Sequence, residues 1–505
     1  MRSEKVMKNG VWGSVYQFIT IILGFVGRTV FIKTLGSSYL GITGLFTNVL
    51  TLFSLTELGF SSAIAFHLYR QLANDDQEEI SAIMNFYRGV YRVVASVILV
   101  LGLMVIPFLH LIIKESPFGL SYIRLVFLIY VVKTVSTYFF SYNFTLVNAD
   151  QKKYILTKID ICLHVLTSCV NILTLVLFRN YIVYLVTEIL IGIIGNYLKT
   201  LRVRKEYPYL DRNAKICKEY QKKIWGDVRN IFAGKVSTVI VTSTDNILIS
   251  SIINVTAVGL YSNYSMIITY VSTFLTQFTS ATQASLGNML AQESKEYSYT
   301  VLKRLTTILY FVTSFCTVSL LVLLNPFIIA WIGEKYLLDF QIVLICVVNF
   351  YIQIMKTPMW FSVGGLGYFK EDRNIAIYGA ISNLLVSIIA AKCLGLFGIF
   401  FGTAFSQITQ WILKSKLYCK KYMNIKATEY AFQVLRLTAL SIVLAIVTWA
   451  ISFFVRCNNQ YLALFQKACV CLLVPNLLNY FLFHKSEEFR YLMSVFSRIK
   501  LRKVF

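Results

Sequence analysis

Apolar segments long enough to cross a lipid bilayer recur along the whole 505-residue chain. About fourteen runs of roughly 20 residues meet this criterion, because a helix of that length spans the hydrocarbon core. Hydrophobic residues make up 57% of the chain and charged residues only 14%, which excludes an ordinary soluble fold. Backbone polar groups in lipid must be satisfied within the protein. We therefore expect an all-α polytopic membrane protein of about fourteen transmembrane helices.

The basic residues indicate how these helices are oriented. Lys and Arg outnumber Asp and Glu by 48 to 24, giving a net charge of +24. If the N-terminus is cytoplasmic, about 34 of the basic residues fall on cytoplasmic segments and about 6 outside, which is the positive-inside pattern. We expect both termini to be cytoplasmic, with basic loops near anionic lipid head groups and no nucleic-acid partner. The ten cysteines form no CxxC pair and no Cys/His metal spacing, so we expect no metal site.

The two halves of the chain resemble each other. A shift of 218 positions places Gly41 on Gly259 and Ser54 on Ser272, and it superposes the polar stripes of two consecutive helices. Because each half holds six spans, an even number, we expect parallel lobes related by an axis along the membrane normal. The expected domains are an N-terminal lobe (1–200), a basic cytoplasmic linker (201–224), a C-terminal lobe (225–426), and two further helices with a basic tail (427–505).

A charged residue stands within the first apolar span. Gln17, Thr20, Gly24 and Arg28 recur at helical spacing, so they share one helix face. Charge is costly within a membrane helix, so such residues normally face a bundle interior or a wet cavity. The alternative is that Arg28 extends to the head groups. Lys33 lies nearer the helix end and suits that role better.

The cations expected at membrane depth favour an anionic substrate, because guanidinium and ammonium groups bind phosphate through charge-assisted hydrogen bonds. We predict the substrate-binding residues to be Arg28, Lys133, Lys235, Lys356, Gln17 and Thr242. The coupling-ion candidates are Asp245, Glu57 and Asp160. Alternatively these acids, together with Glu188, pair with the cations and lock helices together. No P-loop and no G-x-S-x-G motif is present, so we expect neither catalytic residues nor an enzyme.

Five sequence runs resemble the Wzx-type polysaccharide transporters of bacteria. In the first half they are Gly24–Gly36 (GFVGRTVFIKTLG), Tyr39–Phe46 (YLGITGLF) and Thr56–Phe60 (TELGF), and in the second half Thr244–Ser250 (TDNILIS) and Val258–Tyr261 (VGLY). That family belongs to the MOP superfamily, with the MATE drug exporters and the lipid II flippases. The resemblance implies two six-helix, MATE-like lobes in the bacterial cytoplasmic membrane. It also implies a flippase that moves polyprenyl-diphosphate-linked oligosaccharide from the inner to the outer leaflet, by alternating access, for exopolysaccharide or O-antigen biosynthesis. Arg28 matches a cavity arginine of related flippases.

Two other classes of membrane protein are alternatives. A MATE-like exporter of cationic drugs would require an acidic cavity. A membrane polymerase or glycosyltransferase would usually carry a large external loop, whereas all the outer loops expected here are short. We expect a monomer without cofactors that is coupled to the membrane potential, H⁺ or Na⁺. Its expected partners are the lipid-linked oligosaccharide, membrane lipids, and a polysaccharide polymerase with other biosynthesis proteins.

Overall fold

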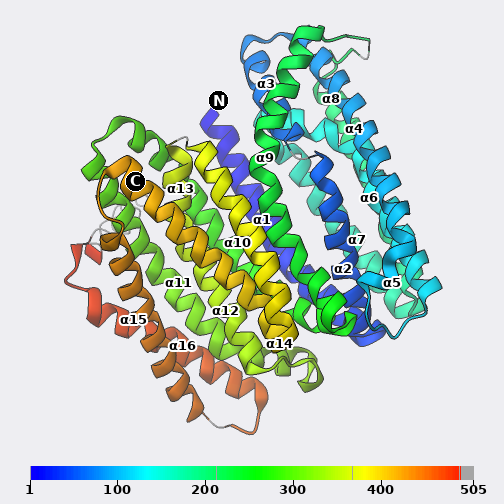
Figure 1. Cartoon of the computed structure of the whole chain (residues 1–505). Coiled ribbons are helices and arrows are strands. Elements are labelled where there is room, and N and C mark those ends of the chain that lie inside the picture. Colours follow the sequence, from blue (N-terminus) through cyan, green and yellow to red (C-terminus); the bar gives the residue numbers. More distant parts are fainter. Residues whose placement is uncertain are drawn as a thin grey trace. The chain divides into compact units, whose positions relative to one another are not determined.

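The computed structural model of the chain is built from helices (Figure 1). It describes residues 2–57, 59–211, 213–366, 368–455, 457–487 and 489–490; within these, the side chains at 2, 3, 6, 56, 230, 231, 233–238, 240–242, 277, 278, 280–292, 365 and 369 are not described. No strand occurs in those ranges. The expected all-α membrane fold is therefore confirmed.

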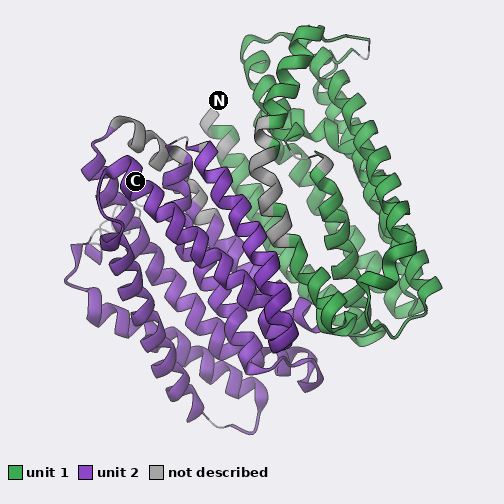
Figure 2. Cartoon of the chain, viewed as in Figure 1, with its two compact units in different colours: residues 1–259 green, residues 260–505 purple. Residues whose placement is uncertain are grey.

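Contacts divide the chain into two compact units, Met1–Gly259 and Leu260–Phe505 (Figure 2). Unit 1 holds α1 (Arg2–Leu35), α2 (Ser37–Phe53), α3 (Phe60–Asn74), α4 (Gln77–Val105), α5 (Leu109–Ile112), α6 (Leu120–Ala149), α7 (Lys153–Phe178), α8 (Tyr181–Glu206) and α9 (Lys218–Leu248). The boundary falls within α10 (Val255–Gln292). Unit 2 continues with α11 (Lys295–Ile332), α12 (Phe340–Met355), α13 (Thr357–Gly365), α14 (Phe369–Leu417), α15 (Thr428–Phe453) and α16 (Gln460–Phe483). Because α9 packs against α2 and α3, it clusters with unit 1. The lobe limits expected at residues 200 and 225 stay a prediction.

Ten helical segments among the described residues are long and apolar enough to cross a membrane. The protein is therefore a multi-pass membrane protein, while the count of fourteen spans stays a prediction. The 49-residue α14 is interrupted at Gly395, whose φ of 58° and ψ of −134° are not helical. The sequence predicts two spans in this region, one at about residues 375–391 and one at about residues 394–413, so the interruption falls near their junction.

The second expected span is broken into α2, the short η1 (Ser54–Glu57) and α3. The break comes just before Gly59, whose φ of +99° suits a residue without a side chain. A Cβ atom there would lie 2.7 Å from the carbonyl oxygen of Val228 in α9, which leaves no room for another residue. Glu57 therefore stands at a helix break and not in the middle of a regular helix.

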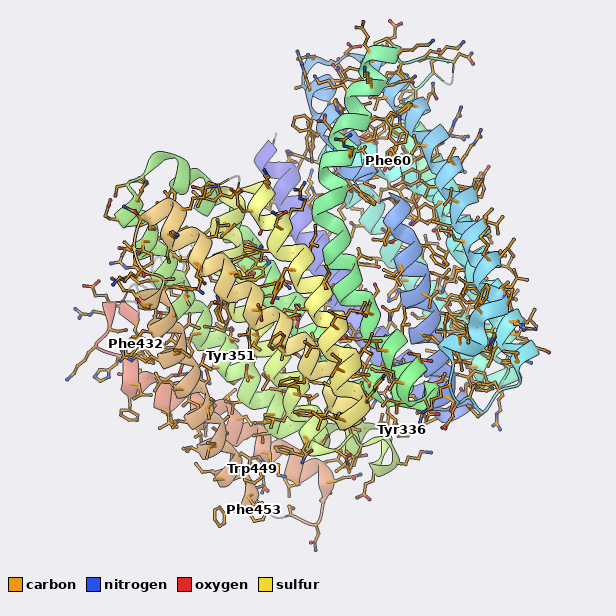
Figure 3. All side chains as sticks on the ribbon, viewed as in Figure 1. Phe60, Tyr336, Tyr351, Phe432, Trp449 and Phe453 are labelled. Atoms are coloured by element: carbon orange, nitrogen blue, oxygen red, sulfur yellow. The ribbon has the colours of Figure 1, made fainter. Side chains whose placement is uncertain are left out.

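Interhelical hydrogen bonds and close packing hold the units together, because lipid supplies no hydrophobic drive between membrane helices. In unit 2 the Tyr310 hydroxyl of α11 donates to Asn479 Oδ1 of α16 at 3.2 Å, and Asn479 Nδ2 donates to Ser314 Oγ at 3.2 Å. Phe432 and Phe453 lie near the two ends of α15 and are 72% and 59% exposed (Figure 3). Such aromatic ends suit the two membrane–water boundaries.

Candidate functional site

Arg28 lies on the face of α1 that meets α8. Phe31, one turn further, is buried, with its ring 5.9 Å from that of Tyr181 and 5.4 Å from that of Tyr184. Arg28 is half-buried, and its charge acts on the Tyr184 hydroxyl. Lys33, in contrast, is exposed in the last turn of α1. The structure thus places Arg28 against neighbouring helices and leaves the helix end to Lys33.

Lys133 of α6 meets the same side of α8. Its Nζ lies 2.9 Å from a carboxylate oxygen of Glu188 and 5.5 Å from the centre of the Tyr130 ring. The side chains of Lys133 and Glu188 are 32% and 28% exposed, so this ion pair is only partly buried within the protein. Glu188 acts as the counter-ion of Lys133.

Hydroxyl groups join the helices that carry these charges. The Tyr181 hydroxyl of α8 is hydrogen-bonded to Thr43 Oγ1 of α2 at 2.7 Å and to the Tyr130 hydroxyl of α6 at 3.1 Å. Both tyrosines are buried. Because buried polar groups bonded to each other fix the positions of their helices, this chain of hydroxyls holds α2, α6 and α8 in register.

We call Arg28, Lys133, Tyr184 and Glu188 the unit 1 cluster. Its two cations and one anion leave a formal charge of +1 (two minus one). An arginine can bind phosphate bidentately and a lysine acts as a point charge, so the cluster suits an anionic ligand.

A second group of cations lies in unit 2, near the junction between α12 and α13. Lys356 Nζ donates to Gln407 Oε1 at 2.8 Å and lies 4.9 Å from the centre of the Trp360 ring. Lys414 lies 4.2 Å from the centre of the same indole ring and forms an ion pair with Asp372. Within the described part of the chain, Lys356 has no carboxylate within ion-pair distance. Two ammonium groups thus share one aromatic ring, which stabilises cations through its π face.

The acidic candidates have different surroundings. A carboxylate oxygen of Asp160 in α7 lies 3.0 Å from Lys199 Nζ of α8. Asp160 therefore forms an ion pair with a cation, as in the alternative given for the acidic residues. Asp245 is half-buried near the end of α9. Gln17 is half-buried in α1. The side chains of Lys235 and Thr242 lie outside the described residues.

Glu57 lies among hydroxyl groups. Its carboxylate accepts hydrogen bonds from Ser61 Oγ, at 3.0 Å, and from the Tyr91 hydroxyl. The Tyr87 hydroxyl donates to that of Tyr91 at 2.8 Å and lies 3.3 Å from Thr145 Oγ1. No cation stands within ion-pair distance of Glu57 among the residues whose side chains are described. A carboxylate held by neutral donors can take up a proton or a small cation without first breaking an ion pair.

Sequence reasoning missed the aromatic and amide partners of the cations. Tyr181 and Tyr184 precede Glu188 by seven and four residues, so the three share one face of α8. The same test of helical spacing that singled out Arg28 would have found them. Trp360 follows Lys356 by four residues, so helical spacing would have found it as well. Gln407 carried no such signal, because α14 brings it to Lys356 from a distant part of the chain.

The helical arrangement is the fold that lipid flippases and multidrug transporters of known structure share. The structure of the lipid II flippase MurJ in an inward closed conformation is similar, with a TM-score of 0.66 and 15% identity, over 93% of this chain and 98% of that chain. An inward-facing multidrug resistance MATE family transporter of the MOP superfamily has a TM-score of 0.65 and 12% identity, over 83% and 95%. The Vibrio cholerae MATE transporter VcmN in its bent form gives 0.54 and 12%, over 84% and 99%.

The sequence itself defines the family. The profile of the family described as "Polysaccharide biosynthesis protein" matches residues 6–285, more than half of the chain. The chain therefore belongs to the polysaccharide biosynthesis protein family, and it is a membrane flippase or transporter. No curated protein sequence matches it.

Proposed function

We propose that this protein is a flippase that carries polyprenyl-diphosphate-linked oligosaccharide from the cytoplasmic to the outer leaflet for cell-surface polysaccharide biosynthesis. The family and the flippase-like fold support a lipid-linked sugar as the cargo. The observation that carries the proposal is the unit 1 cluster, where Arg28 lies near Tyr184 of α8 and Lys133 pairs with Glu188 of the same helix. A diphosphate is the part of the cargo that such cations bind most strongly.

The ion pair between Lys133 and Glu188 suggests how the head group binds and leaves. A phosphate oxygen arriving at Lys133 replaces the carboxylate of Glu188, and Arg28 holds a second oxygen bidentately. When the cargo departs, Glu188 returns to Lys133 and no buried cation is left without a partner. This exchange keeps binding reversible, since an unpaired cation in the membrane would hold the diphosphate too tightly.

Unit 2, taken by itself, holds an apolar pocket that suits a lipid chain. An apolar pocket of about 770 Å³ lies along α12, α14 and α15 and includes Leu344, Ile408, Val434 and Trp449. Its lining is almost entirely hydrocarbon, with Lys416 at one end. Such a surface suits a polyprenyl chain, whose branched isoprene units pack against aliphatic and aromatic side chains. Lys356 in unit 2 is a further candidate for contact with an anionic group of the cargo.

Glu57 is the residue that we propose for coupling. Its hydroxyl donors, Ser61 and Tyr91, hold the carboxylate at the break between α2 and α3, where a change of charge would alter helix packing. Inside-negative membrane potential drives an anion outward, at about 2.3 kcal/mol per charge per 100 mV. If Arg28 and Lys133 move with the diphosphate, the net charge that crosses the membrane falls towards zero, and the driving force of the membrane potential falls with it. A proton or Na⁺ at Glu57 then resets the transporter, with Asp245 as the second candidate.

The alternative functions fit the site less well. A carrier of cationic drugs needs an excess of acidic groups, whereas the unit 1 cluster has an excess of basic ones. We take the protein to work without catalysis, as the transporters that share its fold do.

Ligand binding tests this proposal. The purified protein should be stabilised against thermal unfolding by a polyprenyl-diphosphate-linked oligosaccharide, and hardly at all by the matching polyprenyl alcohol or by a lipophilic cation such as tetraphenylphosphonium. Stabilisation by the cation at lower concentration than by the diphosphate lipid would contradict the proposal and support the exporter.

A further inference from the structure

A polar pocket lies in unit 1 at the end where α4 begins and where α6 and α8 end. It has a volume of about 220 Å³, and its lining includes Asn85, Arg88, Tyr142, Asn143, Arg204 and Asp211. None of these residues belongs to the unit 1 cluster. The pocket is therefore a separate site without an assigned role.

One wall of the pocket is built by hydrogen bonds. Asn85 Nδ2 of α4 donates to the carbonyl oxygens of Asp211, at 2.8 Å, and Ala214, at 2.9 Å. Ser81 Oγ, one turn earlier and buried, accepts from the Asp211 amide at 3.3 Å. The Tyr207 hydroxyl donates to Asp150 Oδ2 at 2.9 Å. These bonds fix the segment that follows α8 against α4, so the pocket is a shaped feature of the fold.

Two guanidinium groups, those of Arg88 and Arg204, line the pocket. Among the described residues, neither Arg88 nor Arg204 lies within ion-pair distance of a carboxylate. Glu206, the acid nearest to Arg204 in sequence, is held by Lys152 at 3.1 Å and by Arg202 at 3.6 Å. The Asp211 carboxylate at the pocket is exposed and accepts from the Asn213 amide. Two cations and one anion leave a charge of +1 (two minus one), which favours an anionic ligand.

A separate apolar groove lies further along α4. Arg92 follows Arg88 by one helical turn, about 6 Å along the axis. From Arg92 the groove runs past Val93, Val97 and Val100 to Met104, with a volume of about 440 Å³. The exposed fractions of these four apolar side chains lie between 38% and 63%. Its length, about 18 Å for twelve residues, matches one leaflet of hydrocarbon, about 15 Å.

We propose that this pocket binds the phosphate of an anionic phospholipid, with one acyl chain lying in the α4 groove. A free phosphate would use the arginines alone, whereas a phospholipid could also place an acyl chain in the groove lined by Arg92, one helical turn beyond Arg88. The lipid would brace α4, α6 and α8, the helices that position Lys133 and Glu188. The proposal depends on the membrane location of unit 1 and not on the transport of lipid-linked sugar, so each can fail without the other.

The test measures thermal unfolding of the delipidated full-length protein in detergent, with phosphatidylglycerol, phosphatidylcholine or inorganic phosphate added. We expect phosphatidylglycerol to raise the melting temperature saturably, and the other two to have little effect. The double variant Arg88→Gln/Arg204→Gln should need at least about tenfold more phosphatidylglycerol for the same rise, because both bidentate contacts are lost. Native mass spectrometry should show fewer retained anionic lipids on this variant.

The matched control is Arg70→Gln/Arg436→Gln, which removes two exposed arginines from α3 and α15 outside the pocket. It should respond to phosphatidylglycerol like the unchanged protein. Should the double variant fold poorly, Arg88→Lys keeps the charge and should show an intermediate response. Equal protection by the two phospholipids, an unaltered response of the double variant, or equal protection by inorganic phosphate would overturn the proposal.

Discussion

Ser38 and Thr256 are 218 positions apart in the sequence, and their hydroxyl oxygens are 3.3 Å apart in the structure. The same offset of 218 relates Gly41 to Gly259. A Cβ atom on Gly259 would lie 2.0 Å from the Ser37 carbonyl oxygen, and one on Gly41 would lie 1.9 Å from that of Val255. Residues related by the repeat thus meet within unit 1, as expected for equivalent elements beside a shared axis.

The ion pair between Lys133 and Glu188 predicts an effect on affinity. Glu188→Gln removes the carboxylate that competes with phosphate for Lys133, so we expect about tenfold tighter binding of a polyprenyl diphosphate. Lys133→Gln should weaken binding. Equilibrium binding in detergent measures both, with Glu334→Gln as a control that removes an exposed acid. Weaker binding by Glu188→Gln would show that Glu188 supports the site and does not compete for it.

Glu57→Gln should abolish the response of transport to the coupling ion. The amide keeps the size of the side chain but cannot carry the charge that a proton or Na⁺ neutralises. Flipping in proteoliposomes is measured with an imposed pH gradient, Na⁺ gradient or membrane potential. We expect the gradient response to disappear in Glu57→Gln and to weaken in Tyr91→Phe, which removes one donor. An unchanged response in Glu57→Gln would show that Glu57 is not the coupling residue and would leave Asp245 as the candidate.

Asp150 should stabilise unit 1 in a pH-dependent manner. Burial raises the pKa of this carboxyl, but hydrogen bonds from Lys5, Lys152 and Tyr207 outweigh it and hold the pKa below the usual value. The stabilisation is therefore complete above the unfolded pKa of about 4, and it is lost as pH falls through the lower folded pKa.

At pH 7, Asp150→Asn should reduce the free energy of unfolding by about 1.5 kcal/mol. The difference from the unchanged protein should shrink below about pH 4. Thermal unfolding across pH measures it, with the exposed Asp75→Asn as control. If the difference in unfolding free energy stays constant from pH 7 to pH 3, the charge of Asp150 is not the cause, and the effect is due to packing.

The ends of unit 1 predict a labelling pattern. The rings of Tyr39 and Phe118 lie 4.5 Å apart, so the turns at Ser37 and Ser116 share one end. Asn85 binds the backbone of Asp211, so Asn74 and Asn213 belong to the other end. In a cysteine-free background, single cysteines at Ser37 and Ser116 should react with an impermeant reagent from outside, and those at Asn74 and Asn213 should not. Labelling of the cysteine at position 213 from outside would show that the chain has the opposite orientation in the membrane.

Periodicity and length were enough to predict the class of fold. Apolar runs of about 20 residues predict membrane helices, and the helical spacing of Arg28 identified the face that meets α8. The break between α2 and α3 was not predicted. It depends on the close approach of α9 to Gly59, a contact between distant segments that composition does not encode.

The partners of the predicted site residues were harder to foresee. The sequence contains several acids that could pair with Lys133. Glu188 is the partner because α6 packs on α8, and this packing cannot be read from the sequence. Asp160 was a coupling candidate by type, yet its position places it beside Lys199. Charge type follows from the sequence, whereas pairing follows from which helices are neighbours.

The most direct measurement is the flipping of a labelled polyprenyl-diphosphate-linked oligosaccharide in proteoliposomes that hold the purified protein. The unchanged protein should expose the substrate to the opposite leaflet. Arg28→Ala should insert normally but flip at least about tenfold more slowly, and Arg28→Lys should recover only part of the rate because bidentate contact is lost. Lys33→Ala, which removes an exposed cation near the end of α1, should flip normally. Full flipping by Arg28→Ala at equal protein content would contradict the role of the unit 1 cluster in binding the head group.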